Sequence, residues 1–234
     1  MNGFSHAFQQ AVDLVAAADP KLVEIVFLSL RISLVAVLFG CAVGLPLGAL
    51  IAVNRFVGRR TVIVLLNGLL GLPSVVVGLV VYLLLSRAGP LGSWGILFTP
   101  TAMVIAQAIL ITPTVAALSR QVVADAWQEY REQLRSLGET GFGAAGTLLW
   151  DLRFSLVTIV LAGFGRAVSE VGAVMIVGGN IDGVTRVMTT TIALETSKGD
   201  LPLALGLGFI LLAIVLVLNA GAFLVKETAQ RRYG

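Results

Sequence analysis

Long apolar stretches alternate with short polar segments along this chain, and the pattern predicts helices that cross a membrane. A bilayer span needs about 20 mostly apolar residues. Five stretches reach this length with few or no charges, at about residues 22–53, 61–86, 97–119, 154–178 and 201–225. We therefore expect an all-α polytopic membrane protein. A sixth element could lie in the first twenty residues or in the loop 179–200.

One polar interruption, residues 120–150, is long and has helical spacing. Apolar residues recur at helical intervals between Val122 and Leu137, which predicts a helix there. Gly138 would end it, because glycine tolerates the left-handed conformation at a helix C-terminus. Residues 139–150 are expected to form a second short helix. The segment thus predicts a helix–turn–helix platform along the membrane, although a merely solvated polar face would show similar charges.

Composition agrees with insertion into a membrane. Of the 234 residues, 57% are hydrophobic and 12% are charged, and the mean hydropathy is +0.96, whereas a soluble domain carries about 25% charged residues. Basic residues collect at the ends of the predicted spans, so the net charge of +3 does not indicate nucleic acid binding. With one cysteine (Cys41) and one histidine (His6), the chain can form no internal disulfide, histidine-based triad or multi-histidine metal site.

The distribution of Lys and Arg between the predicted spans indicates an orientation, because cytoplasmic segments are enriched in both. Residues 54–60, 120–153 and 226–234 together carry ten basic residues. The segments on the opposite side carry four: Lys21, Arg87, Arg186 and Lys198. We therefore expect residues 1–21 outside, the platform in the cytoplasm, and residues 226–234 as a cytoplasmic tail.

Glycines and prolines inside the predicted spans indicate close packing and kinks. Gly40, Gly44 and Gly48 lie on one face of the first span, and such spacing lets helices approach closely, within the subunit or across a dimer contact. Prolines in membrane helices kink them. Three lie inside spans: Pro46, Pro73 and Pro113.

Three segments carry a resemblance to a known family. The string EQLRSLG (132–138) resembles the EAA loop of binding-protein-dependent ABC importer permeases. Glu132 and Gly138 match that loop, whereas Gln133 and Leu134 stand in place of its two alanines. LPSVVVGL (72–79) resembles the second-span segment of the same permeases. FGRAVSEVGAVMIVGGNIDGVTRVMTTTIALETSKGD (164–200) resembles the tungstate-type branch, which is related to the molybdate and sulfate permeases.

The resemblance covers roughly residues 22–224 and implies a type I ABC importer transmembrane domain over residues 22–225. It implies a homodimer in the plasma (inner) membrane of a prokaryote. Two ATPase subunits would bind ATP and Mg, and an extracytoplasmic binding protein would deliver the oxyanion, most consistently tungstate. Coupling to the ATPase would use the platform residues Tyr130, Arg131, Glu132, Gln133, Leu134, Arg135, Leu137 and Gly138. The chain itself would bind no cofactor and no metal.

Charges in the fourth predicted span suggest a translocation pathway. Arg166 and Glu170 are four residues apart, which places them on one side of a helix. Charges at bilayer depth cost about 2.5–3.5 kcal/mol each, so they should face the bundle interior or water. Arg166 either attracts the anion on the pathway or pairs with Glu170 so that both charges are neutralised.

The outside loop that follows carries groups able to donate hydrogen bonds to an oxyanion. The candidate gate or pathway residues there are Asn180, Thr185, Arg186, Thr189 and Thr190. The alternative is a short surface helix that touches the binding protein, with the threonines as ordinary solvated residues.

Other classes of protein fit the sequence less well. The chain has no G-x-x-x-x-G-K-[ST] phosphate loop, which predicts a transport subunit that depends on a separate ATPase rather than an enzyme. A molybdate or sulfate permease remains the nearest alternative. An ion-coupled secondary transporter would show an internal repeat and broken midplane helices. An intramembrane enzyme would need convergent catalytic groups.

Overall fold

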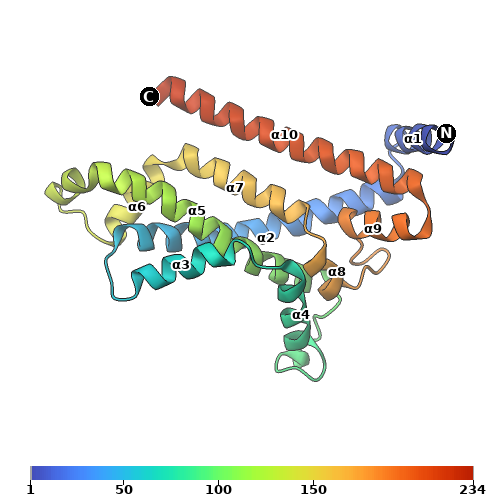
Figure 1. Cartoon of the computed structure of the whole chain (residues 1–234), viewed down its shortest axis with the longest axis horizontal. Coiled ribbons are helices and arrows are strands. Elements are labelled where there is room, and N and C mark those ends of the chain that lie inside the picture. The colour runs from blue at the N-terminus through green and yellow to red at the C-terminus, as the bar shows by residue number, and fades with distance from the viewer. Residues whose placement is uncertain (1, 234) are drawn as a thin grey trace. The chain divides into compact units, whose positions relative to one another are not determined.

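All regular elements within the described residues are helices, as the computed structural model shows (Figure 1). The structure describes residues 2–233 and, within them, the side chains of residues 8–224 and 227. His6 and the basic side chains of the tail 226–234 therefore lie outside the described side chains. The expected all-α class is confirmed. The orientation of the termini stays a prediction.

Ten α-helices and one 3-10 helix follow one another along residues 2–233. They are α1 (Asn2–Ala16), α2 (Pro20–Val53), α3 (Arg59–Leu69), α4 (Ser74–Leu85), η1 (Gly92–Trp94), α5 (Pro100–Ser136), α6 (Phe142–Asp151), α7 (Arg153–Val168), α8 (Gly172–Gly178), α9 (Met188–Lys198) and α10 (Leu201–Tyr233). α9 provides an extra element in the loop 179–200, as the sequence allowed. Its 11 residues extend only about 16 Å, too short to cross a bilayer.

Among the described residues, three helices are long and apolar enough to cross a membrane: α2, α5 and α10. The count rises to five if each of two bent pairs makes one crossing, α3 with α4 and α6 with α7. The expected five spans therefore require broken helices. α7 by itself extends only about 24 Å over its 16 residues, less than the roughly 30 Å of a bilayer's hydrocarbon core.

The second predicted span is not continuous. α3 and α4 meet at a bend of 100°, and the break between them contains Gly71 and Pro73. Proline disfavours the helical conformation of the residue before it and fits the start of a helix. Pro73 accordingly precedes α4 with φ −65° and ψ 120°. Within the expected span at residues 61–86, Pro73 thus separates two helices, which is a sharper interruption than the kink that the sequence predicted.

Two further boundaries differ from those expected. The third span and the first platform helix form one 37-residue helix, α5, which begins at Pro100 rather than near Leu97 or Val122. The polar residues after Ser119 change the environment of the helix but include no glycine or proline before Gly138. The fourth predicted span is interrupted between α7 and α8, at residues 169–171.

The chain divides into two compact units. The first comprises Met1–Val35, Pro73–Gln107 and Gly165–Val217, and the second comprises Ala36–Leu72, Ala108–Phe164 and Leu218–Gly234. In the first unit, α4 and α8 pack closely: a Cβ on Gly78 would lie 2.8 Å from Ala173 Cα. The ring of Phe8 in α1 meets the ring of Phe209 in α10 edge-on, with 5.3 Å between centroids.

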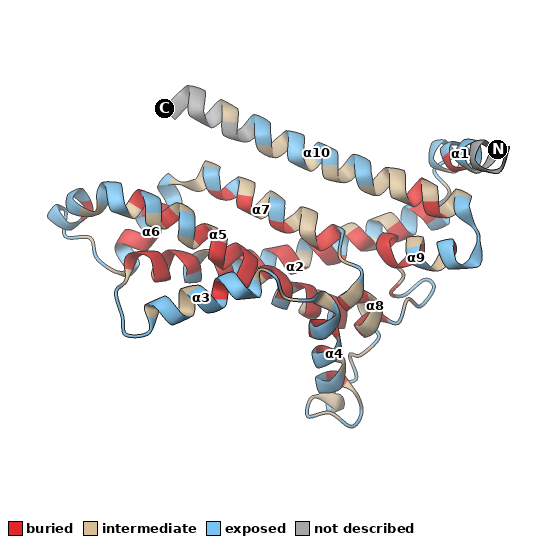
Figure 2. Cartoon of the chain, in the orientation of Figure 1, coloured by how far each residue is buried: buried red, intermediate tan, exposed pale blue. Residues whose placement is uncertain are grey.

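In the second unit, the glycine face of α2 packs against α5. A Cβ on Gly40 would lie 2.8 Å from Ile111 Cγ2, and one on Gly44 would lie 2.8 Å from the Thr112 carbonyl oxygen. Gly48 faces Ser119, whose Oγ donates to the Gly44 carbonyl at 3.3 Å. The interpretation that these glycines allow two helices of one subunit to approach closely is therefore confirmed. Burial follows the same helices, since much of α2 and α5 is buried whereas little of the described part of α10 is (Figure 2).

Candidate functional site

The platform turns at Gly138 through a helix-ending motif. Gly138 has φ +82°, its N–H donates to Arg135 O at 3.0 Å, and the N–H of Glu139 donates to Leu134 O at 2.9 Å. These two bonds form a Schellman motif, which satisfies carbonyls that the end of α5 would leave free. The predicted end of the helix at this glycine is confirmed. The second platform helix is α6, which begins at Phe142 rather than at Glu139.

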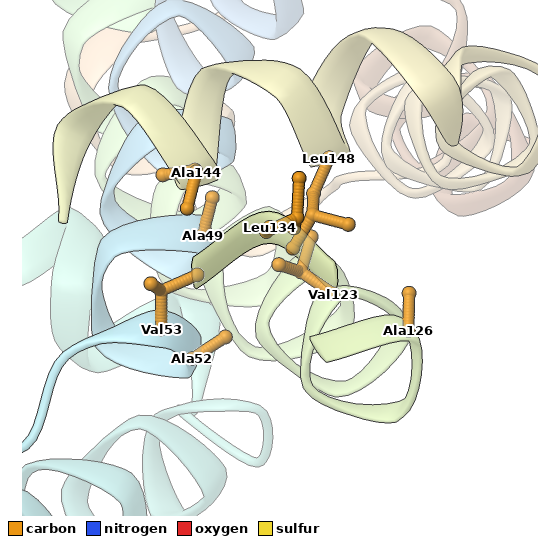
Figure 3. Packing of buried hydrophobic residues seen from close by; sticks show 9 residues of the cluster. Ala49, Ala52, Val53, Val123, Ala126, Leu134, Ala144 and Leu148 are labelled. Atoms are coloured by element: carbon orange, nitrogen blue, oxygen red, sulfur yellow. The ribbon is translucent and has the colours of Figure 1, made fainter. Parts of the chain in front are cut away.

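The inner face of the platform is fixed to the end of α2 by a buried apolar cluster (Figure 3). The end of α2, the last part of α5 and α6 each contribute three side chains: Ala49, Ala52, Val53, Val123, Ala126, Leu134, Ala144, Ala145 and Leu148. Arg59 strengthens this end of α2, because its Nε and Nη2 donate to the carbonyls of Ile51 and Ala52 at 2.8 and 3.1 Å. The end of α5 and α6 are therefore packed together with the end of α2.

The outer face of the platform exposes large apolar side chains. Leu137 is 72% exposed and Phe142 is 81% exposed, on either side of the Gly138 turn, and Trp150 is also exposed. Exposed apolar patches on soluble surfaces mark interaction sites. Sequence reasoning missed Phe142 and Trp150 because it followed the EAA-like string, which ends at Gly138. The signal that could have pointed to Phe142 is an aromatic side chain within a glycine-rich turn.

The predicted coupling residues divide between the two faces. Glu132, Gln133, Arg135 and Leu137 are exposed, whereas Leu134 belongs to the buried cluster and is not available to a partner. The Arg135 guanidinium lies over the Trp127 ring, 6.0 Å from its centroid.

Tyr130 and Arg131 complete the predicted coupling set. Tyr130 is partly exposed at the outer face. The neighbouring Glu129 carboxylate raises the pKa of the Tyr130 phenol, so this side chain is a neutral hydrogen-bonding group at physiological pH. Arg131 is partly buried, and its Nε has no hydrogen-bond partner among the described residues.

The interruption between α7 and α8 changes the expected relation between Arg166 and Glu170. Arg166 lies in the last turn of α7, but Glu170 lies outside both helices. Its Oε1 accepts a hydrogen bond from the N–H of Ala173 at 3.2 Å, at the start of α8. The expected placement of both residues on one continuous helix face was therefore wrong. The Glu170 carboxylate instead holds a backbone N–H in the first turn of α8.

The threonines after the break are structural elements of the loop. Thr185 and Thr190 are fully buried. The Thr185 hydroxyl donates to Gly178 O at 2.6 Å and accepts from the N–H of Ile181 at 2.9 Å. The Thr190 hydroxyl lies 2.9 Å from Asn180 Oδ1 and accepts from the N–H of Val187 at 3.1 Å.

Two more of the predicted gate residues are held by protein contacts. The Thr189 hydroxyl donates to Glu170 O at 2.7 Å, and Arg186 forms an ion pair with Asp182 at 2.8 Å. The expectation of ordinary solvated threonines was wrong, because Thr185, Thr189 and Thr190 are all buried. No three His, Cys, Asp or Glu residues converge as a metal site within the described part of the chain.

Comparison with known proteins identifies the family. The chain is 40% identical to the tungstate uptake system permease protein TupB of Peptoclostridium acidaminophilum, over 97% of this chain and 100% of that protein. The chain belongs to the ABC transporter permease family. It is also 43% identical to a probable anion ABC transporter permease of Haloferax volcanii, over 91% of this chain and 94% of that protein. A second tungstate uptake permease, from Campylobacter jejuni, is 34% identical, over 94% of this chain and 92% of that protein.

This family membership agrees with the helical architecture. ABC permeases are transport components of the membrane, and this member is a multi-pass membrane protein with apolar helices of spanning length. A sulfate transport permease of Escherichia coli matches at a lower identity, 29% over 92% of this chain. No protein-family model matches the chain.

Proposed function

We propose that this permease is the membrane subunit of an importer for an oxyanion, tungstate, driven by ATP that a separate subunit hydrolyses. The observation that carries the proposal is the 40% identity to a tungstate uptake permease over the full length of that protein. Molybdate is the nearest alternative cargo, since it is also a tetrahedral dianion. The lower identity to a sulfate permease makes sulfate a weaker alternative.

The ATPase binds the outer face of the platform. This assignment is supported by the exposed side chains of Leu137 and Phe142 beside a turn that the Schellman motif fixes. The buried cluster on the inner face supports transmission of force, because close-packed interiors pass on displacement instead of absorbing it. In this proposal the docking surface is the Leu137–Phe142 turn together with the exposed members of residues 130–138. ATP and Mg bind at the ATPase.

The assembly contains two copies of this chain, two ATPase subunits and an extracytoplasmic binding protein. The platform and the tail 226–234 face the cytoplasm and residues 1–21 face outside, as the excess of Lys and Arg in the cytoplasmic segments supports. The broken α7–α8 region contributes to the pathway through Arg166 and Glu170. The buried threonines Thr185, Thr189 and Thr190, together with Asn180 and Arg186, shape the gate through their internal hydrogen bonds.

The decisive experiment reconstitutes this chain with its ATPase and its binding protein in lipid vesicles. Tungstate accumulation should require ATP and the binding protein, and omission of either should abolish it. Uptake that an ion gradient drives without ATP would refute the proposal. Calorimetric titration of the binding protein with tungstate, molybdate and sulfate would decide the cargo, and we expect tungstate to bind most tightly.

A further inference from the structure

The break between α7 and α8 leaves backbone groups that a continuous helix would satisfy. In hydrocarbon such groups must find partners within the protein. Two bonds are local: the Ser169 hydroxyl donates to Gly165 O at 2.8 Å, and Glu170 Oε1 accepts from the N–H of Ala173. The other two side-chain bonds come from elsewhere in the chain. Thr189 of α9 donates to Glu170 O, and Gln107 of α5 donates to Ala167 O at 3.0 Å.

The bond from Gln107 replaces a bond of the uninterrupted helix. In an α-helix the carbonyl of residue i accepts from the N–H of residue i+4, so a continuous α7–α8 helix would join Ala167 O to the N–H of Val171. Here Ala167 O instead accepts from Gln107 Nε2 and from the N–H of Glu170, at 3.0 and 3.2 Å. The amide of Gln107 therefore competes directly with the bond that would straighten this segment.

The environment of Gln107 shows that its hydrogen bond to Ala167 comes with a loss of stability. The side chain is only 4% exposed, and its Oε1 has no hydrogen-bond partner among the described residues. Exchanging the amide oxygen and nitrogen would not help, because it would place two acceptors against each other at Ala167 O. A buried acceptor without a donor destabilises a protein, whereas an apolar side chain of similar shape would not. Packing alone therefore does not account for a glutamine at this position.

We propose that Gln107 is a positioning residue that keeps the α7–α8 segment broken by occupying the Ala167 carbonyl. Its role rests on the proposed transport function, since the break lies beside Arg166 and Glu170 of the suggested pathway. Removing the Gln107 amide shifts the equilibrium between the broken and the continuous α7–α8 segment toward the continuous helix. Loss of one hydrogen bond of this kind corresponds to a change of about tenfold in the ratio of the two forms.

The test combines a distance measurement with transport. Spin labels are placed at Val157 in α7 and Ile181 after α8, both exposed positions, in the full complex with Cys41→Ala. Gln107→Leu, and Gln107→Met as a variant with a similar shape, should lengthen or broaden the distance between the labels and lower tungstate uptake about tenfold. Thr114→Val is the matched control, because it removes a buried side-chain bond within α5, to Leu110 O. It should leave the distance unchanged.

The outcomes separate this inference from the proposed function. An unchanged label distance in both Gln107 variants would overturn the positioning role, even if uptake fell. A change of equal size in Thr114→Val would also overturn it, because any lost bond in α5 would then have the same effect. A parent complex that imports no tungstate, but whose label distance responds to Gln107→Leu, would refute the cargo and support the positioning role.

Discussion

Replacing Gly138 with valine tests whether the platform turn couples ATP hydrolysis to transport. Gly138 has φ +82°, and a Cβ at this position would meet no atom within 4 Å. The cost of the substitution therefore comes from the backbone conformation and not from a clash. An L-residue in the left-handed region costs about 1–2 kcal/mol, and a β-branched side chain lies at the upper end of that range. Such a change lowers the ratio of the native turn to other conformations by roughly 5–30-fold.

The assay measures tungstate uptake and ATP hydrolysis together in vesicles that contain the whole complex. We expect Gly138→Val to reduce uptake, by at most about 5–30-fold, and to lower the number of anions moved per ATP. Gly138→Asn should retain most activity, because asparagine tolerates the left-handed conformation. Gly146→Val is the matched control: Gly146 lies inside α6 with equally open space around it and no positive φ. Full uptake by Gly138→Val with the ATPase assembled would refute the coupling role of this turn.

Three further substitutions test other parts of the proposal. Leu148→Ala should destabilise the platform by about 2–5 kcal/mol, because Leu148 is 2% exposed within the cluster that joins α6 to α2; thermal unfolding of the purified permease would show this, and an unchanged melting temperature would contradict it. Phe142→Asp should leave that melting temperature unchanged but abolish co-purification of the ATPase, whereas retained co-purification would exclude Phe142 from the docking surface. Arg166→Ala should reduce uptake far more than assembly if Arg166 serves the pathway, and equal losses on size-exclusion chromatography and in uptake would show a structural role.

Local signals in the sequence predicted the features that depend on a few neighbouring residues. The end of the platform helix at Gly138 is one, since the need for a left-handed residue at a helix end is a local property. The close packing of Gly40 and Gly44 is another, because the spacing alone puts both on one face of α2. The membrane class followed from composition, and the family followed from the EAA-like string together with the long match at residues 164–200.

Features that depend on distant contacts could not be predicted in this way. Residues 169–171 contain no glycine or proline, so their sequence gives no reason to interrupt a helix. The break is held by Gln107, 60 positions before its acceptor Ala167, and by Thr189. In α5 the sequence instead suggested a helix boundary that does not exist. Charged residues follow Ser119, but no residue there stops the helix. Hydropathy reports the environment of a helix, and it does not report where the helix ends.

The continuity of α5 has a mechanical consequence. This one helix carries Gln107, which clamps the α7–α8 break, and also Leu134, which belongs to the platform cluster. The two positions are 27 residues apart, or about 40 Å along the helix axis. α5 therefore joins the α7–α8 break to the platform through one helix, and Pro113, which lies between the two positions and has no backbone N–H to donate, is the place where that connection is easiest to bend.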